Sequence, residues 1–281
     1  MRTRQRRAAV VGSPVAHSLS PVLHLAAYRA LGLTGWTYER VEADAAALPG
    51  LVSSLDDSWV GLSVTMPGKQ AALSVATDAT TRAVAVGAAN TLVRQESGWR
   101  ADCTDVDGVV GALRAAGFAG TGYGVVLGAG GTACAALAGL ADLGFEQAYV
   151  VAREPGRAEP ASRCGSKLGL AVEVLRWAAV PWEALARDAS VLVNTAPADA
   201  IEPHVPALAL APCVLDVIYH PWPTKLAAAV GAHGGRLATG LDMLLHQAFG
   251  QVELFTGLSA PRSTMRDALH EATGGMVPLP I

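Results

Sequence analysis

The chain has 281 residues, and this length predicts two domains rather than one compact domain. Hydrophobic residues make up 51% of the sequence and aromatic residues only 5%, so the core must consist largely of alanine, valine and leucine. The net charge of −3 and the lack of a long basic run argue against nucleic acid as a partner, and no run of about 18 apolar residues predicts a membrane span.

The cysteines and the N-terminal arginines predict neither a metal site nor an export signal. No CxxC pair occurs and no histidine lies at ligand spacing from a cysteine, which favours free thiols in a reducing compartment and no bound metal. The apolar stretch after the arginines is broken by Gly12 and Pro14, so it is too short for a signal peptide. We therefore expect a cytoplasmic protein with a frayed N-terminus. The cysteines are Cys103, Cys134, Cys164 and Cys213, and the arginines are Arg2, Arg4, Arg6 and Arg7.

The first part of the chain predicts short strands that alternate with helices. Strands are expected over 8–11, 36–41 and 59–64, and a hairpin over 90–94 and 99–102 turns at Ser97-Gly98. Helices are expected over 20–30, over 45–55 with an interruption at Pro49-Gly50, after Gly68, and over 105–116. Ser20 is the predicted N-cap of the first of these helices.

The second part of the chain has the spacing of repeated βαβ units. Strands are expected over 124–127, 148–151, 172–175, 191–193 and 214–217, and a helix follows a glycine-rich turn and runs to 143. Further helices are expected after Gly240 and after Pro261. Alternating strands and helices predict an α/β fold with a parallel sheet covered on both faces.

The glycine-rich turn is typical of a dinucleotide site. Residues 128–133 read GAGGTA, after a strand and before a helix. In such a turn the first glycine permits the tight bend, the second lets a pyrophosphate approach the backbone, and the helix N-terminus attracts the phosphates. The simpler interpretation is an ordinary strand–helix loop.

Two arginines favour NADP over NAD. An NAD site usually has a carboxylate at the end of the next strand to bind the ribose 2′-hydroxyl, whereas Arg153 and Arg157 stand there in this chain. Guanidinium groups suit a 2′-phosphate by charge and by geometry. Glu154 lies between them and opposes a phosphate by its charge.

Several polar residues follow the strands of the first part, where open α/β sheets place their sites. Each has a structural explanation as a helix cap, a turn residue or an exposed side chain. Together they supply donors for a carboxylate and for hydroxyls, one lysine and one carboxylate. These residues are Ser18, Ser20, Thr65, Lys69, Asn90 and Asp105.

Seven short motifs occur in a fixed order between residues 8 and 270. They are GSPVAHSLSP at 12–21, GLSVTMPGK at 61–69, GAANT at 87–91, TDVDG at 104–108, GAGGTA at 128–133, DVIYHPWPTKL at 216–226 and GLDMLLHQA at 240–248. As a set they resemble the shikimate dehydrogenase family. Ser63 and Cys103 stand where the family usually has asparagine, Ala152-Arg153-Glu154 replaces Asn-Arg-Thr, and the glycine expected after Pro197 is missing.

The resemblance implies a two-domain oxidoreductase. An N-terminal α/β domain, residues 1–107 completed by 241–281, would bind the substrate, and residues 108–240 would form a Rossmann domain that binds NADP. Lys69 and Asp105 would be the catalytic pair. Substrate contacts would come from Ser18, Ser20, Thr65, Asn90, Tyr219 and Gln247. Cofactor contacts would come from Gly128, Ala129, Gly130, Gly131, Arg153, Arg157, Gly240 and Met243.

The implied reaction is the NADP-linked interconversion of 3-dehydroshikimate and shikimate, on the pathway to the aromatic amino acids. Small-molecule substrate and cofactor are the only expected ligands, and the protein is expected to be a monomer or a homodimer. Two alternatives stay open: a dehydrogenase acting on quinate or amino-shikimate, and a dinucleotide-binding redox sensor without turnover.

Overall fold

The structure is a computed structural model, and it describes residues 5–281. The chain divides into two compact units. The N-terminal unit contains the residues up to Thr104 together with Gln247–Leu279, and the central unit contains Asp105–His246. One helix, α12 (Gly240–Thr256), begins in the central unit and continues into the N-terminal unit.

The N-terminal unit is built on a six-stranded mixed sheet in the order β2-β1-β3-β5-β6-β4. Its strands are β1 (Arg6–Gly12), β2 (Trp36–Glu42), β3 (Trp59–Val64), β4 (Asp78–Ala79), β5 (Thr91–Gln95) and β6 (Gly98–Asp102). β1 pairs in parallel with β2 and β3, whereas β5 pairs antiparallel with β3 and β6, as the predicted hairpin requires.

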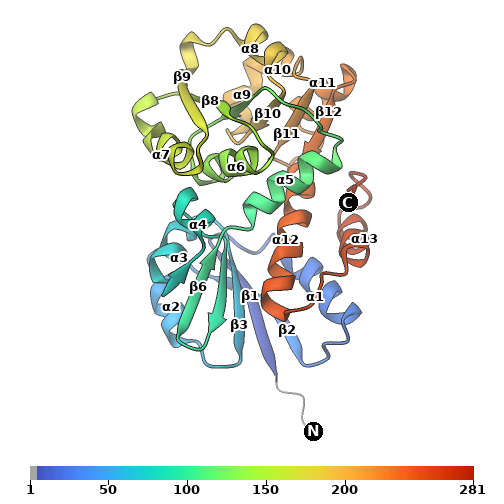
Figure 1. The fold of residues 1–281 in the computed structure, drawn as a ribbon. Helices are drawn as coiled ribbons and strands as arrows, with labels where there is room; N and C mark the ends of the chain where they lie inside the picture. The colour runs from blue at the N-terminus through green and yellow to red at the C-terminus, as the bar shows by residue number, and fades with distance from the viewer. Residues whose placement is uncertain (1–4) are drawn as a thin grey trace. The chain divides into compact units, whose positions relative to one another are not determined.

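Helices cover both faces of this sheet. α2 (Leu48–Ser54) and α3 (Lys69–Val75) lie on one side of it in Figure 1, where Leu48, Val52 and Ala72 pack on a core that includes Val11 and Leu62. α1 (Ser20–Ala30), α13 (Arg262–Ala272) and α4 (Thr81–Val86) complete the unit. All of Ala8–Val11 in β1 are buried, as a central strand covered on both faces requires.

The central unit contains a six-stranded parallel sheet in the order β12-β11-β10-β7-β8-β9. In chain order the strands are β7 (Tyr123–Leu127), β8 (Gln147–Ala152), β9 (Ala171–Arg176), β10 (Val191–Asn194), β11 (Cys213–Asp216) and β12 (Arg236–Thr239). This is the doubly wound Rossmann order, in which the direction of progression reverses between β7 and β10. Ligands of such sheets bind outside the carboxyl ends of the two strands at the reversal.

Two groups of helices cover the parallel sheet. α8 (Trp182–Asp188), α10 (Val205–Leu208) and α11 (Lys225–Ala232) share one core cluster with residues of the strands. α5 (Asp105–Ala115), α6 (Gly131–Asp142) and α7 (Glu159–Leu168) pack in sequence with one another (Figure 1). A short helix, α9 (Ala198–Ile201), and three 3₁₀ turns, η1 (Pro155–Ala158), η2 (Trp177–Ala179) and η3 (Glu202–His204), connect these elements.

Some sequence expectations were wrong in detail. β1 begins at Arg6, and Arg7 bonds Glu39 at 2.8 Å and lies 4.3 Å from the centre of the Trp59 ring, so these arginines are not a frayed end. Arg2 and Arg4 lie outside the described residues. Pro49 does not interrupt a helix but occupies the first turn of α2, where its missing N–H costs nothing. β4, α4 and β12 were not predicted.

Within residues 5–281, no helix is both long and apolar enough to cross a membrane. The same residues contain no cluster of three or more histidine, cysteine or acidic side chains that could hold a metal ion. All four cysteines are buried free thiols.

One buried histidine makes the stability of the N-terminal unit depend on pH. His24 on α1 is fully buried, its ring stacks 4.0 Å from that of Tyr38, and its Nε2 lies 3.3 Å from Gln251 Oε1. Burial lowers the pKa of His24 from 6.5 to about 3, and the hydrogen bond to Gln251 only partly opposes this shift. The folded protein therefore keeps His24 neutral where an unfolded chain would bind a proton.

We predict that replacing His24 by Phe flattens the pH dependence of stability. Between pH 6.5 and about 3 the unfolded state binds the extra proton. Unfolding free energy should therefore fall by about 1.4 kcal/mol per pH unit below 6.5 from this group alone. Denaturant unfolding at pH 7, 6 and 5 measures this slope. The control is His270→Gln, at an exposed position of α13. Equal slopes in His24→Phe and the unmodified protein would contradict the prediction.

Candidate active site

Ser18 and Ser20 lie together at the start of α1. Their hydroxyl oxygens are 3.2 Å apart, Ser18 is half-buried and Ser20 is buried. The expectation that Ser20 caps α1 was wrong: Leu19 is the N-cap residue, and the Ser18 hydroxyl accepts from the Ser20 backbone N–H at 3.3 Å. The Ser20 hydroxyl is therefore not used as a cap, and the two hydroxyls form one small polar patch.

The loop that carries Ser18 is held by β2. Arg40 donates to the Ser18 backbone carbonyl at 2.6 and 3.1 Å, and Glu42 accepts from the Ser13 hydroxyl at 2.7 Å and from the Val15 N–H at 3.2 Å. These bonds fix the backbone of the loop, and none of them uses the hydroxyl groups of Ser18 and Ser20.

Thr65 and Lys69 follow β3 directly. The Thr65 N–H donates to the Val11 carbonyl at 2.8 Å, and the Thr65 carbonyl accepts from Gly68 at 2.9 Å in the turn that begins α3. Lys69 is the first residue of α3 and is half-buried, and its carbonyl accepts from Ala89 at 2.9 Å. The backbones of Lys69 and of the segment before Asn90 are thus joined.

Asn90 and Gln247 are brought together in a buried cluster. Asn90 Nδ2 donates to Gln247 Oε1 at 3.1 Å and to Thr104 Oγ1 at 3.0 Å, and Asn90 Oδ1 accepts from the Thr104 N–H at 2.7 Å. Asn90, Thr104 and Gln247 are each at most 6% exposed. The amides are therefore held in place by hydrogen bonds as well as by packing, which fixes their orientation before any ligand binds.

A second glutamine, which the sequence analysis missed, lies four residues along α12. Gln251 accepts at Oε1 from the Ser63 hydroxyl at 2.7 Å, and its Nε2 donates to the Asn90 carbonyl at 3.2 Å and to Thr91 Oγ1 at 3.0 Å. Its side chain is 1% exposed. The i, i+4 spacing from Gln247 places both amides on one face of the helix, and this spacing was the signal available in the sequence.

Tyr38 connects this cluster to the serine patch. Its hydroxyl donates to Ser63 Oγ at 2.7 Å and also hydrogen-bonds Ser20. Burial raises the pKa of Tyr38, and these bonds only partly oppose the shift. A continuous chain of hydrogen bonds therefore runs from Ser18 through Tyr38, Ser63 and Gln251 to Asn90.

The two departures from the family pattern in this unit have local partners. The Ser63 hydroxyl accepts from Tyr38 and donates to Gln251, so it links these two side chains. The Cys103 N–H donates to Asp102 Oδ1 at 2.7 Å. Burial opposes ionisation of Asp102, but its two bonds with Arg82, at 2.7 and 2.9 Å, and a bond from Thr80 outweigh burial and lower its pKa.

Asp105 opens the central unit as the first residue of α5, and it is 7% exposed. Lys69 belongs to the N-terminal unit, so the two predicted catalytic residues lie in different compact units. Thr104, which bonds Asn90 and, at 3.3 Å, Gln247, is the residue immediately before Asp105. The start of α5 is therefore attached by one peptide bond to the polar cluster.

The predicted dinucleotide turn lies at the point where the parallel sheet reverses. Gly128 follows β7 with φ +102°, and a Cβ on it would lie 2.6 Å from Thr195 Oγ1, so only glycine fits. At Gly130 and Gly131 a Cβ would meet nothing within 4 Å. Neither of these two glycines is required by packing within the protein, and the open space beside them is what a pyrophosphate at the start of α6 needs.

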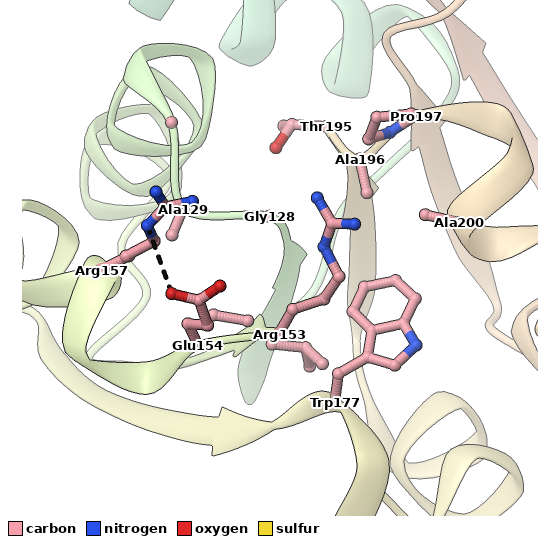
Figure 2. A pocket seen from close by; sticks show the side chains of 13 residues that line it. Gly128, Ala129, Arg153, Glu154, Arg157, Trp177, Thr195, Ala196, Pro197 and Ala200 are labelled. Atoms are coloured by element: carbon pink, nitrogen blue, oxygen red, sulfur yellow. Dashed lines mark ion pairs between the residues drawn. The ribbon is translucent and has the colours of Figure 1, made fainter.

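Arg153 and Arg157 line the same cavity as the glycine turn. The cavity has a volume of about 350 Å³, and in Figure 2 Arg153 extends into it beside Trp177. Arg157 Nε lies 3.3 Å from the Glu154 carboxylate, so Glu154 turns toward a partner instead of standing alone beside the cavity. Both members of that pair are more than two-thirds exposed, so the ion pair is weak. The full lining is Gly128, Ala129, Gly130, Val151, Ala152, Arg153, Glu154, Arg157, Trp177, Thr195, Ala196, Pro197 and Ala200.

Tyr219, Gly240 and Met243 lie near the ends of β11 and β12. A Cβ on Gly240 would lie 2.1 Å from the Val217 carbonyl oxygen and 2.8 Å from Tyr219 Cδ1, so Gly240 allows the start of α12 to approach the loop after β11. Met243 is 7% exposed and Tyr219 is half-buried. Packing within the unit is thus enough to explain why residue 240 is glycine. The contact of Gly240 with the cofactor stays a prediction.

Comparison with known proteins identifies the family. The model of the shikimate dehydrogenase substrate-binding domain matches residues 10–92, and that of the shikimate 5′-dehydrogenase C-terminal domain matches residues 240–270. The shikimate dehydrogenase (NADP(+)) of Nitrobacter hamburgensis is 37% identical over 278 residues, which cover 96% of this chain and 95% of that protein. The chain belongs to the shikimate dehydrogenase family.

Two solved shikimate dehydrogenases have the same fold. The enzyme of Mycobacterium tuberculosis is 54% identical with a TM-score of 0.90, and the match covers 95% of this chain and 99% of that one. The Thermus thermophilus enzyme, solved in complex with NADP(H) and shikimate, is 33% identical with a TM-score of 0.80, over 95% and 100% of the two chains. Membership of the family confirms the resemblance that the seven motifs predicted, and the α/β fold with a Rossmann-type sheet is confirmed with it.

The bridging role of Ser63 can be tested by a double-mutant cycle with Tyr38. Ser63→Ala removes the acceptor of the Tyr38 hydroxyl and the donor to Gln251, and leaves both groups buried without that partner. We expect a loss of about 1–3 kcal/mol in unfolding free energy. In a Tyr38→Phe background, Ser63→Ala should lower the unfolding free energy by less, because the buried Tyr38 hydroxyl that would lose its acceptor is no longer present. Denaturant unfolding of the four proteins measures the coupling, and additive losses would show that the two side chains do not act together.

Proposed function

We propose that this chain catalyses the reversible, NADP-dependent reduction of 3-dehydroshikimate to shikimate, a step toward the aromatic amino acids. The observation that carries the proposal is the likeness, along nearly the whole chain, to shikimate dehydrogenases that include one solved with both NADP(H) and shikimate. The geometry of each unit supports it locally.

The two units divide the work. Residues 1–107, completed by 241–281, bind the substrate, and residues 108–240 bind the cofactor. The polar cluster of the N-terminal unit supports the first assignment, since neutral hydroxyl and amide groups suit a ring that carries hydroxyls and a carboxylate. The hydroxyls of Ser18 and Ser20 take the carboxylate with the help of Tyr219. The ring hydroxyls are taken by Thr65, Asn90, Asp105 and Gln247.

The central unit suits NADP. The open space beside Gly130 and Gly131 accepts the pyrophosphate at the start of α6, and Ala129 lines the same cavity. Arg153 and Arg157 hold the 2′-phosphate, and Gly240 and Met243 border the nicotinamide. NADP supplies the hydride when bound, and the protein supplies position and charge.

Lys69 and Asp105 carry the proton chemistry. Reduction of a ketone places negative charge on its oxygen, which must be neutralised as it forms. The Lys69 ammonium donates the proton, and the Asp105 carboxylate orients the lysine and the substrate hydroxyl. A monomer or homodimer in the cytoplasm is the state we expect.

One assay tests the proposed function against both alternatives. Purified protein is supplied with shikimate or quinate, each with NADP or NAD, and nicotinamide reduction is followed by absorbance. Fast turnover only with shikimate and NADP supports the proposal. A quinate rate equal to the shikimate rate moves the chain to the dehydrogenases of broader substrate range, and binding of NADP without turnover of either substrate indicates a redox sensor.

Cofactor preference should depend on Arg153. Replacing Arg153 by Ala removes a charge-assisted bond to the 2′-phosphate worth about 1–3 kcal/mol, so kcat/KM for NADP should fall about 5- to 150-fold. The value for NAD, which lacks this phosphate, should change little. Arg163→Ala is the control, because Arg163 lies on α7, pairs with Glu159 and does not line the cavity. An equal loss with both cofactors would remove the 2′-phosphate role from Arg153.

The activity of a Lys69 variant distinguishes an enzyme from a protein that only binds the cofactor. If Lys69 donates the proton, Lys69→Ala should lower kcat by about 100- to 10,000-fold while KM changes far less, because the interaction is made mostly in the transition state. Asp105→Asn should also lower kcat, and the double variant should be little worse than the poorer single one. Lys167→Ala, on the exposed face of α7, serves as the lysine control. A near-normal kcat in Lys69→Ala would overturn the mechanism.

A further inference from the structure

An aromatic side chain forms part of the cavity that contains Arg153. Trp177 is the first residue of η2, directly after the edge strand β9, and its indole is half-buried. Figure 2 shows the ring projecting toward the same space as Arg153, opposite the turn that contains Gly128. Neither the motifs nor the cofactor chemistry described above assigns a role to this ring.

Trp177 is held in place by two other rings. Its Nε1–H donates to His204 Nε2 at 3.2 Å, and its ring meets that of Trp182 edge-on at 4.8 Å. The His204 ring stacks on Trp182 at 4.2 Å with an angle of 22° between the planes. Burial lowers the pKa of His204, which favours the neutral imidazole that can accept this hydrogen bond. The indole is therefore fixed before any ligand arrives.

Packing alone does not account for the position of Trp177. Trp182 belongs to the same aromatic group and packs on the same core cluster, but it does not line the cavity. Trp177 packs on the core cluster and also lines the cavity. The cavity volume of about 350 Å³ is within the usual range of about 300–1,000 Å³ for small-molecule sites. A fixed aromatic face beside two guanidinium groups fits a flat, electron-rich ring that carries a phosphate nearby.

We propose that Trp177 is the residue on which the purine base of the cofactor stacks, and that His204 and Trp182 are positioning residues that hold its indole. The inference rests on the proposed function, since it names the residue that binds the adenine of NADP. Stacking of a base on an aromatic side chain strengthens the binding of single-stranded nucleic acids to their proteins, and it is available to every base. Pre-fixing the ring lowers the entropy lost when the base binds.

Calorimetric titration with adenosine 2′,5′-bisphosphate tests the proposal without turnover, because this probe has the purine and the 2′-phosphate but no nicotinamide. Trp177→Leu should weaken its binding about 5- to 100-fold, and Trp177→Phe should stay within about 3-fold of the unmodified protein. Trp222→Leu is the matched control: it removes a half-buried indole that does not line the cavity, and should weaken binding by less than about 3-fold.

Fluorescence gives a second readout that depends only on the milder variant. The bisphosphate should quench tryptophan emission in the unmodified protein, and Trp177→Phe should remove most of this change. Trp222→Phe, which removes a half-buried tryptophan outside the cavity, should keep it. Undiminished quenching in Trp177→Phe, unchanged affinity in Trp177→Leu, or equal losses in the two leucine variants would each overturn the proposal.

The titration also separates this inference from the proposed function. If the unmodified protein binds neither the bisphosphate nor NADP, the cofactor assignment fails and the role of Trp177 fails with it. If the unmodified protein binds both and Trp177→Leu binds them equally well, only the stacking role is lost and the proposed reaction stands.

Discussion

The side-chain amide of Gln251 is the interaction on which the N-terminal unit depends. An amide can accept at its oxygen and donate twice at its nitrogen, and Gln251 does so with Ser63, His24, Thr91 and the Asn90 backbone. These partners come from β3, α1 and the start of β5, so one side chain of α12 joins three separate parts of the unit. Because the amide is fully buried, losing any one partner leaves one of its donor or acceptor positions unfilled away from water, which couples the four partners to one another.

In the central unit the main structural feature is an open cavity at one end of the parallel sheet. Its sheet reverses between β7 and β10, and the loops that leave these strands diverge there. Thr195 keeps the opening in shape: its N–H and its hydroxyl both donate to the Leu127 carbonyl, at 2.9 and 2.7 Å. At the end of β11, Asp216 accepts from Asn194 at 3.0 Å and from Thr224 at 2.7 Å, which ties the loop after β11 to the end of β10. These three side chains satisfy one another and do not line the cavity.

Sequence patterns reached the fold and the motif residues but not the contacts between them. The glycine turn, Arg153 and Lys69 could be found because each lies in a short local pattern whose chemistry is visible along the chain. Gln251 offered only its i, i+4 spacing from Gln247, and Tyr38 and Trp177 lie in none of the motifs. Their importance comes from contacts that no local pattern shows: Ser63 and Gln251 are 188 residues apart. Ser20 shows the opposite error, since a local capping pattern predicted a role that the backbone of Leu19 takes instead. The short strand β12 escaped because Arg236–Thr239 has only two apolar residues, Leu237 and Ala238, and neither is β-branched or aromatic.

The small side chains of α5 and α6 have a thermodynamic consequence. A Cβ on Gly139 of α6 would lie 2.7 Å from Val109 Cγ1 of α5, so the two helices approach more closely than larger residues would allow. Much of α6 is alanine, and Ala133, Ala135, Ala136 and Ala138 are all buried. Alanine has no side-chain rotamers to lose on folding, whereas each buried leucine or methionine loses roughly 0.5–2 kcal/mol of conformational freedom. A core of this kind gains less free energy from burial per residue but loses less side-chain entropy on folding.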